Sequence, residues 1–155
     1  MSQRVFHGHE AIVTCLAVAL NNEFIVSADR AGILKVFPLT AQTNPRTHDV
    51  EGGERGMAFH PVESSYALAT SSSTIEIWNH DARQPTRTLT GHQGKVRCLT
   101  FHPQGQQLVA GLDDGTISSW NLETGEYLRE LKGHEASLLA LAYSPDGTRL
   151  ASISP

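Results

Sequence analysis

A Gly-His pair recurs along this 155-residue chain at a spacing that limits the fold more than any other feature does. The pairs are Gly8-His9, Gly91-His92 and Gly133-His134. The last two histidines lie 42 residues apart, and the first two lie 83 apart, close to twice that interval. A further unit therefore lies between them, and aligning "FHP" at 59–61 on "FHP" at 101–103 places Val50 where its histidine would stand. Such a period indicates a repeat architecture.

Each unit reads as a set of short strands. Alternating stretches such as "KVRCLTF", "QQLVAGL" and "TISSWN" are bounded by the turns "HPQGQ", "SPDGT" and "DDGT". A fourth strand, "EYLREL" or "PTRTLT", precedes a Gly-His pair, and no segment has a helical period. The sequence therefore predicts an all-β protein of four-stranded antiparallel units. We expect these units at about 7–48, 49–90, 91–132 and, truncated, 133–155.

The Gly-His pair, the "DDGT" turn and the tryptophan of "TISSWN" occur together in the third unit. With these motifs the chain resembles the WD-repeat family, whose repeats are four-stranded blades of a β-propeller. The resemblance covers essentially the whole chain and implies blades around a central channel. It implies an isolated outer strand at residues 2–6 and full inner units at about 11–37, 55–79 and 94–121.

The resemblance also implies a structural tetrad in each blade. The tetrad links the Gly-His histidine to a serine or threonine 18 residues on, then to an aspartate four further on and a tryptophan six beyond that. The positions that match are His9, Ser27, Thr70, Trp78, His92, Asp114, Trp120, His134 and Ser152. Ala110 replaces the serine of the third unit, and Ala31 and Phe37 replace the last two members of the first. Asp29 lies near these positions but is not aligned with any of them. In the second unit, the hairpin between Thr70 and Trp78 is expected to be two residues shorter than in the other units.

His9, Ser27 and Asp29 could also be read as a catalytic triad. A triad tolerates no missing member, whereas this set recurs with different members deleted, as a buried hydrogen-bonded brace would. We therefore expect no catalytic site and a protein that is not an enzyme.

Metal and cofactor sites are not expected either. Among the histidines only His7 and His48 lack a place in the repeat or its turns, and no carboxylate or thiol cluster accompanies them. "EGGERG" lacks the lysine and serine of a phosphate-binding loop and precedes a strand. Cys15 and Cys98 share the contexts "VTCLAV" and "VRCLTF", which indicates a common core position and not a disulfide.

Composition narrows the partners. A formal charge of −4 gives no basic excess for nucleic acid, and the longest apolar run, "CLAVAL", is too short to span a membrane. We expect a cytoplasmic protein whose partners are proteins or peptides.

The predicted function is a non-catalytic scaffold. The resemblance implies that contacts come from the start of the innermost strand and from the turn before the tetrad aspartate. The candidate residues there are Ile12, Thr14, Arg30, Lys95, Arg97, Asp113, Ser137 and Leu139. The alternative is a regulatory or sensing propeller module of a larger, multidomain and even enzymatic protein.

The number of units leaves the ring incomplete, because propellers usually close with four to eight blades. Either the chain is the front half of a longer propeller, which we favour because it stops inside a hairpin, or it closes as a homo-oligomer with another copy.

Overall fold

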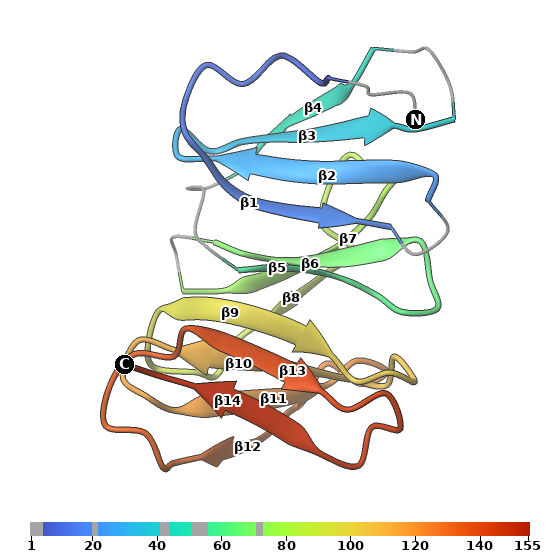
Figure 1. Cartoon of the computed structure of the whole chain (residues 1–155). Helices are drawn as coiled ribbons and strands as arrows, with labels where there is room; N and C mark the ends of the chain where they lie inside the picture. Colours follow the sequence, from blue (N-terminus) through green and yellow to red (C-terminus); the bar gives the residue numbers. More distant parts are fainter. Residues whose placement is uncertain (1–4, 20–21, 41–43, 51–55, 71–72) are drawn as a thin grey trace.

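The computed structural model describes residues 5–19, 22–40, 44–50, 56–70 and 73–155. Over these ranges the chain forms strands and no helix, which confirms the all-β class. The strands make three four-stranded antiparallel sheets and one two-stranded sheet (Figure 1). In the described residues no helix is long and apolar enough to cross a membrane.

Within each sheet the strands are ordered as in the chain, so hairpins join all neighbours. The first sheet contains β1 (Val13–Val18), β2 (Phe24–Asp29), β3 (Ile33–Pro38) and β4 (Arg46–Asp49). The second contains β5 (Met57–Phe59), β6 (Ser65–Ala69), β7 (Ile75–Asn79) and β8 (Arg87–Leu89). The third contains β9 (Val96–Phe101), β10 (Gln107–Leu112), β11 (Ile117–Asn121) and β12 (Tyr127–Leu131). The last contains β13 (Ala140–Tyr143) and β14 (Leu150–Ile153).

The strand expected at residues 2–6 falls mostly outside the described residues. Residues 2–4 lie outside the described part of the chain, and Val5 and Phe6 belong to no strand. Instead, the Phe6 ring packs on Phe37 of β3, with ring centroids 5.2 Å apart. The segment therefore covers the outer half of the first sheet.

The sheets lie face to face, and their first strands are in contact in the order β1, β5, β9, β13 (Figure 1). We call the face that each sheet turns towards the following sheet its front face, and the opposite face its rear face. Alternate residues of a strand point to opposite faces, so each sheet has an apolar layer on both sides. The stack does not close into a ring, and the first and last sheets lie at its two ends.

Small side chains on each front face meet larger ones on the next rear face. Ala67 and Ala69 of β6 share a buried cluster with Leu99, Phe101 and Trp120 of the third sheet. Val26 and Ala28 of the first sheet likewise meet Tyr66 and Trp78 of the second, and Val109 of the third meets Leu138, Tyr143 and Leu150. This pairing of small with large residues fills each interface at close range.

A histidine in the turn after the first strand ties one sheet to the next. His60 Nε2 lies 2.9 Å from the carbonyl oxygen of Gly105, and His102 Nε2 lies 3.2 Å from that of Gly147. Gly105 and Gly147 have φ of 76° and 72°, and a Cβ on either would meet the histidine ring. Glycine is therefore required here for both its backbone conformation and its lack of a side chain.

An arginine of the fourth strand makes a second contact between sheets. Arg46 donates to Asp81 Oδ1 at 2.8 Å and to the His80 carbonyl at 3.3 Å, and Arg87 donates to the Glu123 carbonyl at 3.2 Å. Arg46 pairs with Val36 and Arg87 with Ile77, so the two arginines occupy the same place in their sheets.

Candidate functional site

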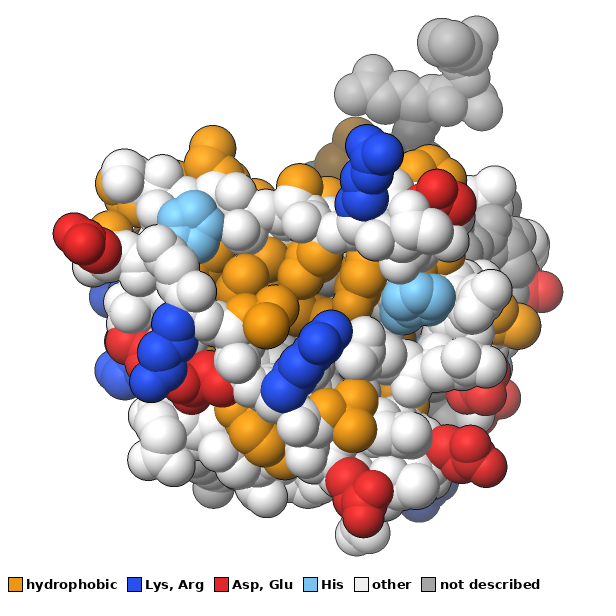
Figure 2. Space-filling view, turned by 90° about the horizontal axis from the view of Figure 1, so that it is seen from below, with side chains coloured by type: hydrophobic (Ala, Val, Ile, Leu, Met, Phe, Trp, Pro, Cys, Tyr) orange, Lys and Arg blue, Asp and Glu red, His pale blue; other side chains and the backbone are white. Residues whose placement is uncertain are grey.

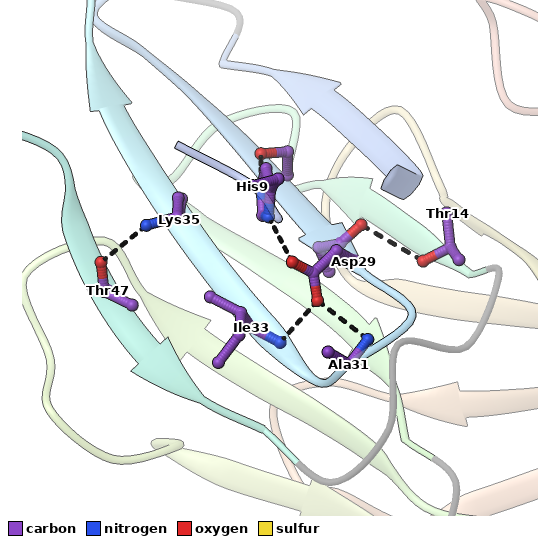
Figure 3. Close-up of polar contacts among 9 residues, drawn as sticks. His9, Thr14, Asp29, Ala31, Ile33, Lys35 and Thr47 are labelled. Carbon is purple, nitrogen blue, oxygen red and sulfur yellow. Dashed lines mark hydrogen bonds and ion pairs between the residues drawn. The ribbon is translucent and has the colours of Figure 1, made fainter. Parts of the chain in front are cut away.

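His9 lies over the first sheet and is held by two side chains of β2. Its Nε2 is 2.7 Å from Ser27 Oγ, and its Nδ1 is 2.7 Å from Asp29 Oδ2 (Figure 3). Ser27 and Asp29 can both reach the ring because residues two apart in a strand point to the same face. Asp29, which the spacing of the repeat left out of alignment, is therefore the acidic partner of this histidine.

Asp29 also organises the turn that follows its strand. Its Oδ1 accepts hydrogen bonds from the backbone N–H groups of Ala31 and Ile33, both at 3.0 Å. Burial acts to raise the pKa of Asp29, but the hydrogen bonds from His9, Ile33 and Ala31 outweigh it and hold the pKa below the usual value. The carboxylate is thus ionised at neutral pH and joins His9 to the β2–β3 turn (Figure 3).

The last unit repeats this brace with a different second partner. His134 Nε2 lies 2.7 Å from Ser152 Oγ, and its Nδ1 lies 2.8 Å from Ser154 Oγ. Ser152 pairs with Leu141 as Ser27 pairs with Leu16, so Ser154 stands where the first unit has Asp29. The sequence pattern did not identify Ser154, although its distance of two residues from Ser152 is the signal that could have done so.

The third unit has the histidine without the brace. The positions of Ser27 and Asp29 are taken by Ala110 and Leu112, which are fully buried. Both ring nitrogens of His92 are consequently buried with no hydrogen-bond partner. The ring stands edge-on to Trp120, with centroids 5.4 Å apart, and burial lowers the pKa of His92 below its usual value.

The other expected members of the third tetrad bond elsewhere. Asp114 Oδ1 accepts from the backbone N–H of Thr116 at 3.0 Å and from its hydroxyl at 2.7 Å. Trp120 Nε1 donates to the carbonyl of Thr90 at 2.8 Å. The structure therefore brings Trp120 to His92 but leaves Asp114 in its own turn.

Strand register corrects the alignment of the second unit. Leu68 pairs with Glu76 as Ser27 pairs with Lys35 and as Ala110 pairs with Ser118, so the hairpin is not shortened. Thr70 consequently stands at the position of Asp29 and not at that of Ser27. It bonds Thr74, with the two hydroxyl oxygens 2.8 Å apart, while Trp78 Nε1 donates to Glu76 at 2.9 Å.

The Ser27–His9–Asp29 arrangement has the hydrogen-bond order of a hydrolase triad, but its position limits its chemistry. Ser27 is only 3% exposed, so its hydroxyl has no room for a substrate carbonyl. The related group in the last unit has a serine in place of the acid. Both groups are suited to fix a loop against a strand.

The two histidines without a place in the repeat lie apart from any ligand cluster. His48 is in β4, its ring tilted against Trp78 at 5.4 Å, and burial together with Arg46 lowers its pKa. In the described part of the chain, no three histidine, cysteine, aspartate or glutamate side chains are grouped to hold a metal ion. Cys15 and Cys98 are free thiols, and burial raises the pKa of each. Cys15 is half-buried against the apolar cluster between the first and second sheets, and Cys98 against that between the third and last sheets.

The candidate partner residues lie at one end of the sheets, where the first strand begins and the second hairpin turns. Arg30 N–H donates to the Ile12 carbonyl at 2.9 Å, and Asp113 N–H donates to the Lys95 carbonyl at the same distance. Asp113 Oδ1 also accepts from the Lys95 N–H at 2.8 Å. In the last unit Leu139 N–H donates to the Ile153 carbonyl at 2.8 Å, and Ser137 lies two residues earlier.

The side chains at this end differ in how far they are exposed to solvent. Ile12 and Leu139 are 70% and 59% exposed, and Arg30 and Lys95 are also exposed. Thr14 is half-buried and donates to the Ala28 carbonyl at 3.2 Å. Arg97 is half-buried, and its Nε is buried without a hydrogen-bond partner. The corresponding part of the second unit, around residues 53–55 and 71, lies outside the described residues.

Comparison with known proteins gives two findings. The family described as "WD domain, G-beta repeat" matches residues 1–37, 83–121 and 125–154, which is more than half of the chain. The chain is also similar to "Polyadenylation factor subunit 2" of Candida albicans, at 25% identity over 87 residues. That match covers 56% of this chain and 16% of the relative, so the chain spans only a small part of the relative's length.

Proposed function

Because the chain belongs to the WD40 repeat family, whose members typically serve as platforms for other proteins, we propose that it is a non-catalytic scaffold. The observation that carries this proposal is the end of the sheets that holds Ile12, Arg30, Lys95 and Leu139. There the backbone is tied by hydrogen bonds while the side chains stay exposed.

A tied backbone favours binding because it reduces the entropy that a loop loses when a partner docks. The same bond from the second hairpin to the start of the first strand occurs in the first sheet, at Arg30 and Ile12, and in the third, at Asp113 and Lys95. Side chains from different blades are therefore presented on prearranged loops.

The chemistry of this end favours an acidic peptide with apolar residues. Arg30, Lys95 and Arg97 supply three positive charges, against one negative charge from the Asp113 carboxylate, which accepts a hydrogen bond from the Lys95 N–H. Ile12 and Leu139 supply apolar contact area. Complementary charge sets the choice and orientation of a partner, and buried apolar anchors supply most of the affinity.

The non-catalytic part of the proposal is supported by the burial of Ser27. The hydroxyl that would act as nucleophile is enclosed, and both nitrogens of His9 are engaged with neighbours in the fold. Hydrogen bonds of this kind hold the loop and leave no group directed at solvent.

A phage-displayed library of random peptides, selected on the 155-residue chain, tests the proposal. We expect the selected peptides to be rich in Asp, Glu and large apolar residues. Binding should weaken at least tenfold on Lys95→Glu with Arg97→Glu, and again on Leu139→Asp. Arg149→Glu, a charge reversal at the opposite end of the sheets, is the matched control and should leave binding unchanged.

Peptides that bind the charge-reversed variant as well as they bind the native chain would overturn the proposed surface. Circular dichroism of every variant distinguishes this result from unfolding. Covalent labelling of Ser27 by a fluorophosphonate would overturn the non-catalytic assignment.

A further inference from the structure

A groove opens between the second and third sheets, at the end of the sheets opposite to the proposed peptide surface. Its volume is about 450 Å³, which lies within the roughly 300–1,000 Å³ of pockets that hold ligands. One wall is the front face of the second sheet with its β5–β6 turn. The other wall is the rear face of the third sheet with its β9–β10 and β11–β12 turns.

Both walls belong to complete four-stranded sheets in the middle of the stack. Figure 2 looks at the stack from the side of its last sheet and shows open apolar side chains across the middle of that face. The groove lies away from that face, because it is bounded by strands β5 to β12. Its shape therefore does not depend on what covers the ends of the stack.

The floor of the groove is mainly apolar. Ile77 and Leu122 are partly buried against the cluster that contains Phe101, and all three side chains line the groove. Ser65 is a polar residue of the same lining and is only 7% exposed. In the described part of the chain its hydroxyl has no hydrogen-bond partner. Buried polar groups are nearly always satisfied, so this hydroxyl indicates a polar ligand group in the groove.

Glu63 brings a carboxylate to the groove from the β5–β6 turn. It lies three residues after His60, the place where Gly105 follows His102 and where glycine also stands in the β13–β14 turn. The second sheet thus has an acidic side chain where these two turns have none. Glu63 is exposed, and among the described residues its carboxylate has no hydrogen bond or ion pair.

Glu123 brings a second carboxylate from the opposite wall. It corresponds to Asp81, because each lies two residues after the asparagine that ends the third strand of its sheet. Arg46 binds the Asp81 carboxylate at 2.8 Å, whereas Arg87 donates to the carbonyl of Glu123 at 3.2 Å. The Glu123 carboxylate is exposed and has no partner among the described residues. The groove therefore has two free carboxylates and one arginine that is bonded to the backbone.

We propose that this groove binds a basic peptide, with the cationic head of a lysine or arginine side chain between Glu63 and Glu123. The long aliphatic stem of such a side chain covers apolar surface, which Ile77 and Leu122 provide. The Ser65 hydroxyl is a further acceptor for a head group that has three or more donors. This site has the opposite charge to the surface proposed for acidic peptides, lies at the other end of the sheets and does not rest on it.

A peptide library with one arginine or lysine at a fixed position, random residues on both sides and no Asp or Glu tests the proposal on the 155-residue chain. The missing acidic residues exclude the peptides expected at the other end of the sheets, so each proposal can fail by itself. We expect binders from this library and none from a matched library with glutamine at the fixed position. Glu63→Gln with Glu123→Gln should weaken the selected peptides about tenfold, because charge-assisted hydrogen bonds are lost.

Glu126→Gln is the matched control. It removes the same charge from an exposed residue of the β11–β12 turn that does not line the groove, so binding should be unchanged. Lys95→Glu with Arg97→Glu, at the other end of the sheets, should not weaken binding either. Circular dichroism of every variant confirms that it is folded.

Ser65→Ala separates binding from stability. Its hydroxyl has no partner in the free chain, so urea denaturation should show no loss in the free energy of unfolding, whereas peptide affinity should fall about threefold. The inference is overturned if the arginine or lysine library yields no binder, or if the glutamine library yields as many. It is also overturned if the selected peptides bind the double glutamine variant or the Ser65→Ala variant as well as they bind the native chain.

Discussion

The histidine that opens the first, third and last units has a different set of partners in each of them. His9 has a serine and an aspartate, His134 has two serines, and His92 has none. A buried polar atom without a partner costs more than a made hydrogen bond contributes. The first and last units are therefore stabilised at this point, and the third carries a local cost.

Ala110→Ser should supply the partner that His92 lacks. The substitution adds one hydroxyl at the position of Ser27, and we expect it to raise the free energy of unfolding by about 0.5–1.5 kcal/mol. Ser27→Ala makes the opposite change and should lower it by about 1–3 kcal/mol, because His9 Nε2 is left unpaired. Urea denaturation of both variants measures whether the free energy of unfolding rises or falls in each. A loss of stability on Ala110→Ser would contradict this account of His92.

His92 should also make stability depend on pH. Its pKa is lowered in the folded chain, so the unfolded chain binds the proton more readily. The contribution of neutral His92 to the free energy of unfolding is fully present above about pH 6.5, the pKa in the unfolded chain. It is lost as the pH falls from there towards the pKa in the folded chain. Chemical denaturation at pH 7.5 and 5.5 should show this loss. His92→Gln should reduce this dependence of stability on pH and leave the part due to His48, whose pKa is also lowered by burial and by Arg46. An unchanged slope would show that His92 titrates normally.

Periodicity was enough to predict some of the residues in these groups, but not all of them, and not how they pair. His9, Ser27, His134 and Ser152 were found by counting residues from one unit to the next. Asp29 was set aside because that count places the acid four residues after the serine, whereas a strand presents residues two apart on one face. Thr70 was misplaced for another reason: counting 18 residues from Val50 leads to Leu68, and Thr70 was chosen by assuming a shorter hairpin. The partners of a side chain depend on strand register, which the hairpins determine.

At the scale of the elements, two of the polar contacts that join neighbouring sheets come from turns. His60 and His102 reach backbone carbonyls 45 residues further along the chain. Every residue has a backbone carbonyl, so the sequence does not identify which one accepts a hydrogen bond. The "FHP" and glycine turns were therefore predicted, but these two contacts between them were not. Among the described residues, no histidine makes such a contact between the first and second sheets. There His80 stacks on Phe24, with ring centroids 4.7 Å apart.

Gly105→Ala should weaken the contact between the second and third sheets. The new Cβ would meet the His60 ring, and alanine is strained at a φ of 76°. We expect a loss of about 1–3 kcal/mol in the free energy of unfolding. Gly133→Ala is the matched control, since a Cβ there meets nothing within 4 Å. If both variants unfold at the same urea concentration, His60 and Gly105 do not restrain the interface.

At the scale of the whole molecule, burial is greatest in the middle of the stack. β6 and β10 are buried almost throughout, whereas every second residue of β13 and β14 is exposed. The last sheet has only two strands, and an isolated pair is marginally stable without a packed face. Opening should therefore begin there.

Amide hydrogen exchange of the chain measures this gradient. We expect peptides from β6 and β10 to exchange slowest and those from β13 and β14 fastest, because local opening exposes few buried contacts at the end of the stack. Uniform protection of all four sheets would contradict the gradient.

The two cysteines occupy one and the same place in different blades, half-buried and with thiol pKa values raised by their surroundings. Thiolate is the form that reacts with an alkylating reagent. Each cysteine is therefore alkylated slowly while its blade is closed and rapidly when the blade opens. The two thiols therefore act as built-in reporters of local opening. The alkylation rate of Cys15 measures the opening of the first blade, and the alkylation rate of Cys98 measures the opening of the third. Neither measurement needs an engineered label.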